Sequence, residues 1–178
     1  NYTQKSLQAI QTAQQLTIQN QNQQIEQVHL LSALLQQDGG LVPQLLKKMG
    51  ISVESFDAAV TAEVNKLPRV TGSGREADRF YVSRQVDEAL TKAEELAKSM
   101  KDDFVSVEHL LLALIDCADS TLKNLLRTYN IKKEDVLQTL QTIRGNQRVT
   151  NDTPEDTYEA LEKYGTDLVK RAREQKMD

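Results

Sequence analysis

The sequence predicts an all-α protein made of two tandem, pseudo-symmetric four-helix repeats followed by one further helix. Its 178 residues include only 3 Pro and 7 Gly, so turns are few and the segments between them are long. Shifted by 80 residues, the sequence matches itself without a gap, most clearly where residues 29–35 (HLLSALL) meet residues 109–115 (HLLLALI). The matching positions are mostly apolar and recur at helical spacing, which is typical of repeated helical units.

Capping and breaking residues delimit the four helices of the first repeat. Thr3 and Ser52 are expected N-caps, because their short side-chain oxygens can accept a hydrogen bond from a free backbone N–H. Pro43 fits a first helical turn, where its missing N–H costs nothing, and Gly50 ends a helix. We expect helices over residues 3–17, 28–37, 41–49 and 52–66.

The second repeat uses the same devices 80 residues later. Ser83 stands where Thr3 stands in the first repeat. Ser106 caps the next helix and Glu108 lies in its first turn, where a carboxylate favours the positive end of the helix. We expect helices over residues 83–100, from 106 onwards, over 122–129 and over 134–143.

Two breaks divide the chain into predicted regions. Gly72 and Gly74 make residues 67–79 a flexible connector, and a second break lies at residues 144–151. Thr153 then caps a ninth helix, which has few apolar residues and is typical of a bridge between domains. We predict one domain over residues 1–150, with repeats at 1–66 and 81–145, and a linker helix over 151–178 that leads towards a further domain.

Composition excludes several classes of protein. The net charge of −4 and the pI near 5.3 do not supply the basic surface that nucleic acids and anionic membranes attract. No apolar run approaches the roughly 18 residues of a membrane span, and no signal peptide is visible. We expect a soluble, cytoplasmic protein that binds neither nucleic acid nor membrane.

Residues able to carry out chemistry are few. No Gly is followed by Lys, so a phosphate-binding loop is absent. His29 and His109 occupy the same place in the two repeats, and we interpret each as a half-buried imidazole with local hydrogen bonds rather than a catalytic base or a zinc ligand. Cys117 is alone, which excludes a disulfide framework and leaves a Cys117-dependent hydrolase as a minor hypothesis. We expect no enzyme activity, cofactor or metal site in this chain.

Two stretches of surface are candidates for binding polypeptide. Residues 1–37 are rich in Gln and carry only Lys5 and Glu26 as charges, so this face is either a neutral solvated surface or one that is cheap to desolvate on docking. In the second repeat Asp102 lies close to Phe104, an arrangement that suits basic and apolar peptides but also serves helix capping.

The second helices of the two repeats carry one motif, VHLLSALL at 28–35 and VEHLLLALI at 107–115. The start reads YTQKSLQAIQTAQ, the connector LPRVTGSG, the opening of the second repeat YVSRQVDEAL, and the end IRGNQRVT followed by EDTYEALEKYGTDLVKRAREQKMD. With these segments the whole chain resembles the Clp N-terminal domain in its ClpB-type form, together with the linker that leads into the first ATPase domain. Neither repeat has the GTEH segment of ClpC-type sequences.

The resemblance implies a module of a hexameric AAA+ disaggregase that acts in the stress response with a DnaK-type chaperone. ATP and Mg would bind in the ATPase domains of the parent protein and not in this chain. The module, a monomer in isolation, would engage apolar segments of unfolded or aggregated polypeptides and pass them to the ring. Carried over by position, the substrate-binding residues would be Thr3, Leu90, Leu96, Asp102, Phe104, Glu108 and Leu110.

The sequence leaves a second hypothesis open. The chain could be the adaptor-docking domain of a ClpA- or ClpC-type unfoldase–protease, where polar contacts to folded partners would dominate. One position departs from the pattern that the first hypothesis needs, because Lys92 lies on a helix face where members of the family can have an apolar residue.

Overall fold

The computed structural model describes residues 1–70 and 81–156, and it confirms the predicted all-α class. Within these residues there are eight helices and no strand. The helices are α1 (Gln4–Gln19), α2 (Gln27–Leu35), α3 (Leu41–Lys48), α4 (Val53–Lys66), α5 (Arg84–Ser99), α6 (Val107–Asp116), α7 (Ser120–Thr128) and α8 (Lys133–Arg144). The predicted ninth helix is described only over its first turn, at 154–156. Its remainder and residues 71–80, which include most of the predicted connector, lie outside the described residues.

The repeat predicted from the sequence is also a repeat of the backbone. A shift of 80 residues carries α1 onto α5, α2 onto α6, α3 onto α7 and α4 onto α8. The shift also pairs four of the six described residues with positive φ, since Gln21 and Lys101 have φ values of 56° and 60°, and Gly50 and Asn130 have values of 79° and 56°. Gly and Asn tolerate this conformation better than other residues, which explains why they alternate at one site.

The predicted N-caps of four helices are confirmed. The side-chain oxygens of Thr3, Ser52 and Ser83 accept hydrogen bonds from backbone N–H groups three residues later, at 3.2, 3.3 and 3.1 Å. Ser106 occupies the N-cap of α6 and donates its own backbone N–H to Nδ1 of His109 at 2.9 Å. Asp119, which the sequence analysis did not single out, caps α7 through the N–H of Leu122 at 2.9 Å.

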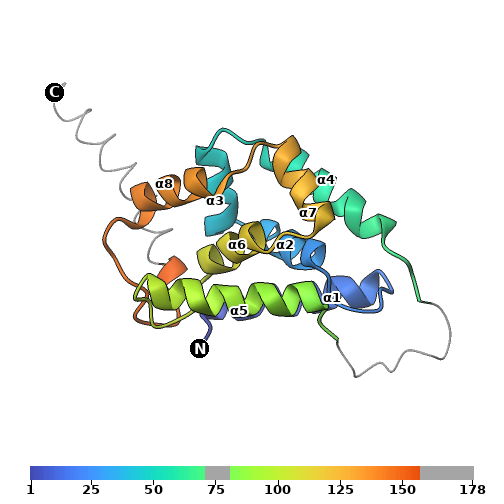
Figure 1. Ribbon diagram of the computed structural model, residues 1–178, viewed down its shortest axis with the longest axis horizontal. Helices are drawn as coiled ribbons and strands as arrows, with labels where there is room; N and C mark the ends of the chain where they lie inside the picture. Colours follow the sequence, from blue (N-terminus) through green and yellow to red (C-terminus); the bar gives the residue numbers. More distant parts are fainter. Residues whose placement is uncertain (71–80, 157–178) are drawn as a thin grey trace.

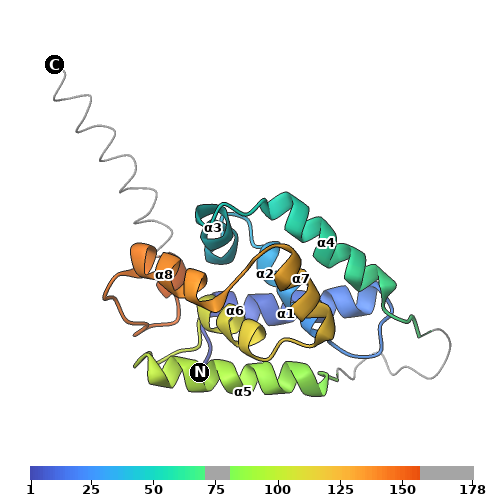
Figure 2. The ribbon, with the colours of Figure 1, turned by 45° about the horizontal axis from the view of Figure 1, so that its top comes forward.

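Two apolar helices, α2 and α6, form the centre of the molecule. Every residue of α2 is buried, and so is every residue of α6 from Val107 to Leu114. The two helices contact each other and lie between α1 and α5 on one side and α3, α4, α7 and α8 on the other (Figures 1 and 2). A helix that is apolar all round must be covered on all sides, so neither repeat could shield its central helix alone.

The two repeats also interlock at their starts. The N–H of Thr3 donates to the carbonyl of Val105 at 3.0 Å, and the N–H of Val105 donates to the carbonyl of Asn1 at 2.8 Å. The equivalent pairing joins Ile25 to the residues around Val82, with N–H to carbonyl distances of 2.8 and 2.9 Å. Each repeat therefore lends its first residues to the other, and the two are expected to unfold together.

This mutual burial predicts a large cost for a core truncation. Leu34, fully buried in α2, should lose about 2–5 kcal/mol of unfolding free energy on substitution by Ala, because a cavity remains between the central helices. The control Leu7→Ala removes a side chain that is 48% exposed and should change it by about 0.5 kcal/mol or less. Urea unfolding followed by circular dichroism measures both, and a small effect of Leu34→Ala would contradict the interlocked core.

Candidate functional site

A buried histidine in the first repeat has two uncharged partners for its ring nitrogens. Nδ1 of His29 accepts the backbone N–H of Glu26 at 2.9 Å, so the ring proton lies on Nε2, which is 2.8 Å from Oδ1 of Asn22. Burial lowers the pKa of His29 from 6.5 to about 4. The predicted local role of this imidazole is what the geometry favours, because a base this weak stays neutral at physiological pH.

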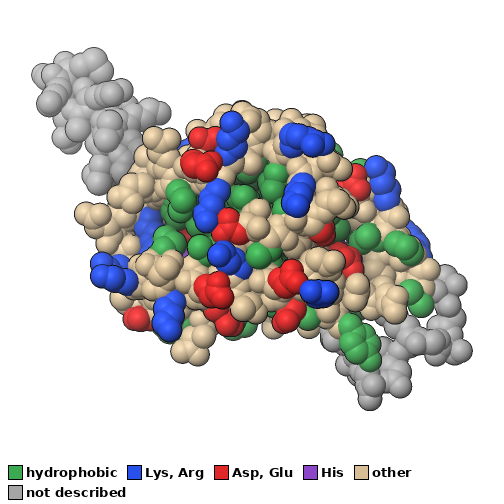
Figure 3. Space-filling model, viewed as in Figure 1, with side chains coloured by type: hydrophobic (Ala, Val, Ile, Leu, Met, Phe, Trp, Pro, Cys, Tyr) green, Lys and Arg blue, Asp and Glu red, His purple; other side chains and the backbone are tan. Residues whose placement is uncertain are grey.

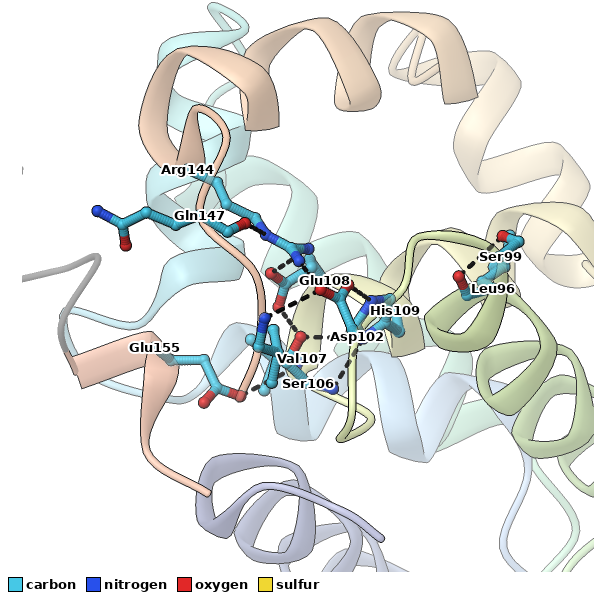
Figure 4. Close-up of polar contacts among 11 residues, drawn as sticks. Leu96, Ser99, Asp102, Ser106, Val107, Glu108, His109, Arg144, Gln147 and Glu155 are labelled. Carbon is cyan, nitrogen blue, oxygen red and sulfur yellow. Dashed lines mark hydrogen bonds and ion pairs between the residues drawn. The ribbon is translucent and has the colours of Figure 1, made fainter. Parts of the chain in front are cut away.

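The second repeat places charges in the equivalent pocket (Figure 4). Nε2 of His109 is 2.8 Å from Oδ2 of Asp102, and the other carboxylate oxygen of Asp102 accepts from Arg144 and, at 2.9 Å, from the backbone N–H of Val149. Arg144 also donates to Glu108 at 3.4 Å. Ser106 donates its hydroxyl to the second carboxylate oxygen of Glu108. One arginine thus bridges two buried carboxylates.

Three substitutions between the repeats account for this difference. Asn22, Val28 and Val64 of the first repeat correspond to Asp102, Glu108 and Arg144 of the second. Burial alone would raise the pKa of Asp102, but the hydrogen bonds from His109, the Val149 N–H and Arg144 outweigh it and lower the pKa. The set is stable only as a unit, since removal of one member leaves a buried charge unpaired.

A further buried carboxylate, that of Glu155, closes the same region from the C-terminal side. Its Oε2 accepts the Thr3 hydroxyl at 2.6 Å and the backbone N–H of Val107, the first residue of α6, at 3.1 Å. Burial raises the pKa of Glu155 from 4.5 to about 7, and the nearby charge of Glu108 acts in the same direction. These two hydrogen bonds and one from the backbone of Glu155 itself oppose the shift without cancelling it.

A groove opens beside this polar cluster, between the end of α5, α8 and the loop that follows α8. Its volume is about 460 Å³, within the range of small ligand sites. It is lined by Met100, Leu137, Leu140, Gln141, Arg144, Gly145, Asn146, Gln147 and Arg148. Figure 3 shows hydrophobic side chains exposed among charged ones on this face. The first repeat has a smaller counterpart of about 200 Å³, whose lining includes Asn20 where the second repeat has Met100.

The described residues offer little for catalysis or metal binding. Burial, aided by Asp116, raises the pKa of the Cys117 thiol, which is the opposite of what a nucleophile needs. The thiol donates to the backbone carbonyl of Glu88 at 3.9 Å. Among the described residues no group of three His, Cys, Asp or Glu side chains could hold a metal ion, and no helix is long and apolar enough to cross a membrane.

Comparison with known proteins identifies the fold. The family model of the Clp repeat (R) N-terminal domain matches residues 1–129. The chain belongs to this family. Chaperone protein ClpB of Nitratidesulfovibrio vulgaris is 42% identical over 178 residues, which cover 99% of this chain but only 21% of the relative, so the chain spans about a fifth of its curated relatives' length. The resemblance to ClpB-type N-terminal regions is therefore confirmed.

Solved structures agree with the fold of a Clp N domain. The Hsp104 N-terminal domain from Candida albicans superposes with a TM-score of 0.75 at 24% identity, covering 87% of this chain and 99% of that one. A ClpV N-domain in complex with a VipB peptide has a TM-score of 0.61 at 20% identity, covering 84% of this chain and 90% of that one.

The structure separates the seven predicted substrate-binding residues of this Clp N domain into two groups. Thr3, Asp102 and Glu108 are buried in one polar region, although no hydrogen bond links Thr3 directly to the other two. Asp102 and Glu108 are engaged with Arg144, so in this structure they do not present charge to a basic peptide. As substrate contacts, all three stay predictions.

The four predicted apolar residues differ in exposure. Leu110 is 1% exposed and belongs to the core, so it presents no surface to a ligand here. Leu90, Leu96 and Phe104 are partly exposed. Leu96 lies one helical turn before Met100, on the same side of the helix, and so comes close to the groove. The sequence analysis did not identify Leu137 as a groove residue. The one feature that could have done so is that Leu137 is apolar while the equivalent residue of the first repeat, Asp57, is charged.

The charged cluster predicts a specific pattern of stability changes. Arg144→Val should cost about 3–5 kcal/mol of unfolding free energy, because two buried carboxylates lose their counter-charge. The triple variant Asp102→Asn, Glu108→Val, Arg144→Val copies the first repeat and should regain most of that loss. Lys133→Ala, which breaks a partly exposed ion pair with Asp116, is the control and should cost about 1 kcal/mol or less. Urea unfolding would refute this account if the triple variant were less stable than Arg144→Val.

The buried imidazole predicts a dependence of stability on pH. His29 should stay neutral in the folded protein down to a pH of about 4, whereas the unfolded chain takes up this proton near 6.5. The contribution of the neutral His29 ring to the free energy of unfolding is thus fully present above a pH of about 6.5 and is lost as the pH falls towards 4. Carbon and nitrogen shifts of the ring, measured by NMR against pH, check the value, and titration near 6.5 would contradict the buried pocket.

Proposed function

We propose that this Clp N domain is a non-catalytic docking module of a ClpB-type disaggregase, which binds apolar segments of unfolded or aggregated polypeptides weakly and passes them to an AAA+ ring. The parent protein would be a cytoplasmic homohexamer that works with a DnaK-type chaperone. Its ATP and Mg would bind in domains outside this chain. The domain itself would be a monomer that needs no cofactor.

The observation that carries the proposal is the groove beside α8. Met100, Leu137 and Leu140 give it an apolar lining, and Leu137 is 39% exposed. The volume of about 460 Å³ suits a few side chains of an extended segment rather than the surface of a folded protein. Arg148 also lines the groove and is exposed, so neutral or acidic segments are favoured over basic ones.

Weak binding follows from the size of the two opposing free energies. Burial of one leucine-sized side chain contributes about 1.5–3 kcal/mol. Fixing the backbone of each residue of an unfolded segment costs about 1–2 kcal/mol. A segment with two or three apolar anchors therefore binds with little net free energy, as suits a module that must release many different substrates.

One finding favours a second candidate, a docking domain for a specific partner peptide or adaptor. The ClpV N-domain of similar fold has been solved with a VipB peptide. At 20% identity this likeness concerns the fold alone, and the test below distinguishes binding of an adaptor from binding of an unfolded segment.

The test is an NMR titration of this chain with a permanently unfolded, reduced and alkylated polypeptide. We expect shifts around Met100, Leu137 and Leu140, and at least a tenfold loss of affinity in Leu137→Asp, because a carboxylate in the groove must be desolvated on binding. The matched control is Ile18→Asp, which alters another exposed apolar residue (44%) in the last turn of α1, at the far end of the molecule from α8 (Figure 1).

Equal loss in both variants, or no shifts at millimolar polypeptide, would contradict docking in the groove. Binding of a folded adaptor by the same chain under those conditions would support the second candidate instead.

A further inference from the structure

The segment 149–156, which we name the exit segment, is fastened to both repeats. The N–H of Asp103 donates to the carbonyl of Val149 at 2.7 Å, which ties the segment to the loop before α6. The backbone N–H of Gln4 donates to the carbonyl of Asp152 at 2.8 Å, and its side-chain amide donates to the carboxylate of Asp152 at 3.0 Å. Val149 is fully buried, so the chain leaves the domain along a defined path up to residue 156.

Glu155 is the point at which this segment reaches both repeats with one side chain. Its Oε2 accepts from Thr3, the N-cap of α1, and from the first N–H of α6. Its Oε1 is buried and has no hydrogen-bond partner among the described residues. A buried oxygen without a donor disfavours the ionised form and is compatible with a proton on the carboxyl group.

The elements packed around Glu155 carry both acidic and basic side chains, and the charge among them that raises its pKa is that of Glu108. On α1, Lys5 is 4.0 Å from Asp156. Arg144 of α8 pairs with Asp102, in the loop before α6, and with Glu108 of α6. His109 of α6 pairs with Asp102. The titratable and charged residues of the packed elements and of the segment itself are Lys5, Asp102, Asp103, Glu108, His109, Arg144, Arg148, Asp152 and Asp156.

We propose that Glu155 is a proton-controlled clasp: with a proton on its carboxyl group it holds the exit segment against α1 and α6, and loss of the proton loosens this contact. The bistable element is the contact of residues 149–156 with the body of the domain. The eight described helices stay folded in both states, because the hydrophobic core contains no residue of the exit segment.

The direction of the effect follows from linkage. The pKa of Glu155 is about 7 in the docked state, and a released, hydrated side chain returns to about 4.5. Docking of the segment is therefore strongest at pH values below about 4.5. Its equilibrium constant falls tenfold for each pH unit up to a pH of about 7 and is constant at higher pH. The whole change is roughly a hundredfold or more in the equilibrium between docked and released segments.

Two measurements test the proposal on this chain. The first is the carboxyl carbon shift of Glu155 in the wild type against pH, which we expect to titrate near 7. The second is amide hydrogen exchange at Gln4 and Asp103, whose N–H groups bond the exit segment. Their protection factors, corrected for intrinsic exchange, should fall at least tenfold between pH 5 and 7.

The matched variants separate the clasp from other effects of pH. Glu155→Gln keeps an oxygen acceptor for Thr3 and Val107 but cannot ionise, so its protection factors should stay constant over this pH range. Asp156→Asn removes the neighbouring carboxylate, which is 58% exposed, and should behave as the wild type. Titration of Glu155 near its ordinary value, or the same pH dependence in wild type and Glu155→Gln, would overturn the proposal. The first readout needs no variant, so it decides even if Glu155→Gln does not fold.

Discussion

The burial of α2 against α6 is the constraint from which the rest of the architecture follows. Both helices are buried along almost their whole length, so they need cover from both repeats at once. The helices α1 and α5 cover one side and the remaining four cover the other. The exchanged backbone pairs at Val105 and Ile25 then fix how the two repeats meet. A single repeat would expose its central helix, which explains why the unit occurs twice.

Within this symmetric frame the second repeat has acquired a charged interior. Asp102, Glu108 and Arg144 replace residues that are neutral in the first repeat, while the backbone and the histidine hydrogen bonds are kept. Such a cluster does not add stability over apolar packing, since desolvation cancels much of the attraction between the charges. Its distinctive contact is with the loop after α8, because Asp102 also accepts the N–H of Val149. The cluster thus positions the start of the exit segment.

The sequence was sufficient for the local features and insufficient for the tertiary ones. Thr3, Ser52 and Ser83 were identified as caps because capping depends on neighbours three residues away. Arg144 was missed because its partners lie 36 and 42 residues away. Glu155 gave no signal of its role in the sequence, because its carboxylate accepts from the first N–H of α6, a contact that no local pattern contains. Leu137 was missed because hydrophobic periodicity does not show which apolar side chain remains exposed in the folded protein.

The groove and the exit segment share one loop, which gives the two proposals a common physical basis. Gln147 and Arg148 line the groove, and Val149, the next residue, is held by Asp102 and packed out of solvent. Gln147 is also tied back, since its carbonyl accepts from Nε of Arg144 at 2.9 Å. A polypeptide that displaced this loop would strain the contact of Val149 with Asp102, at the start of the exit segment. If groove occupancy and docking of the exit segment are coupled in this way, each alters the other's equilibrium by the same factor.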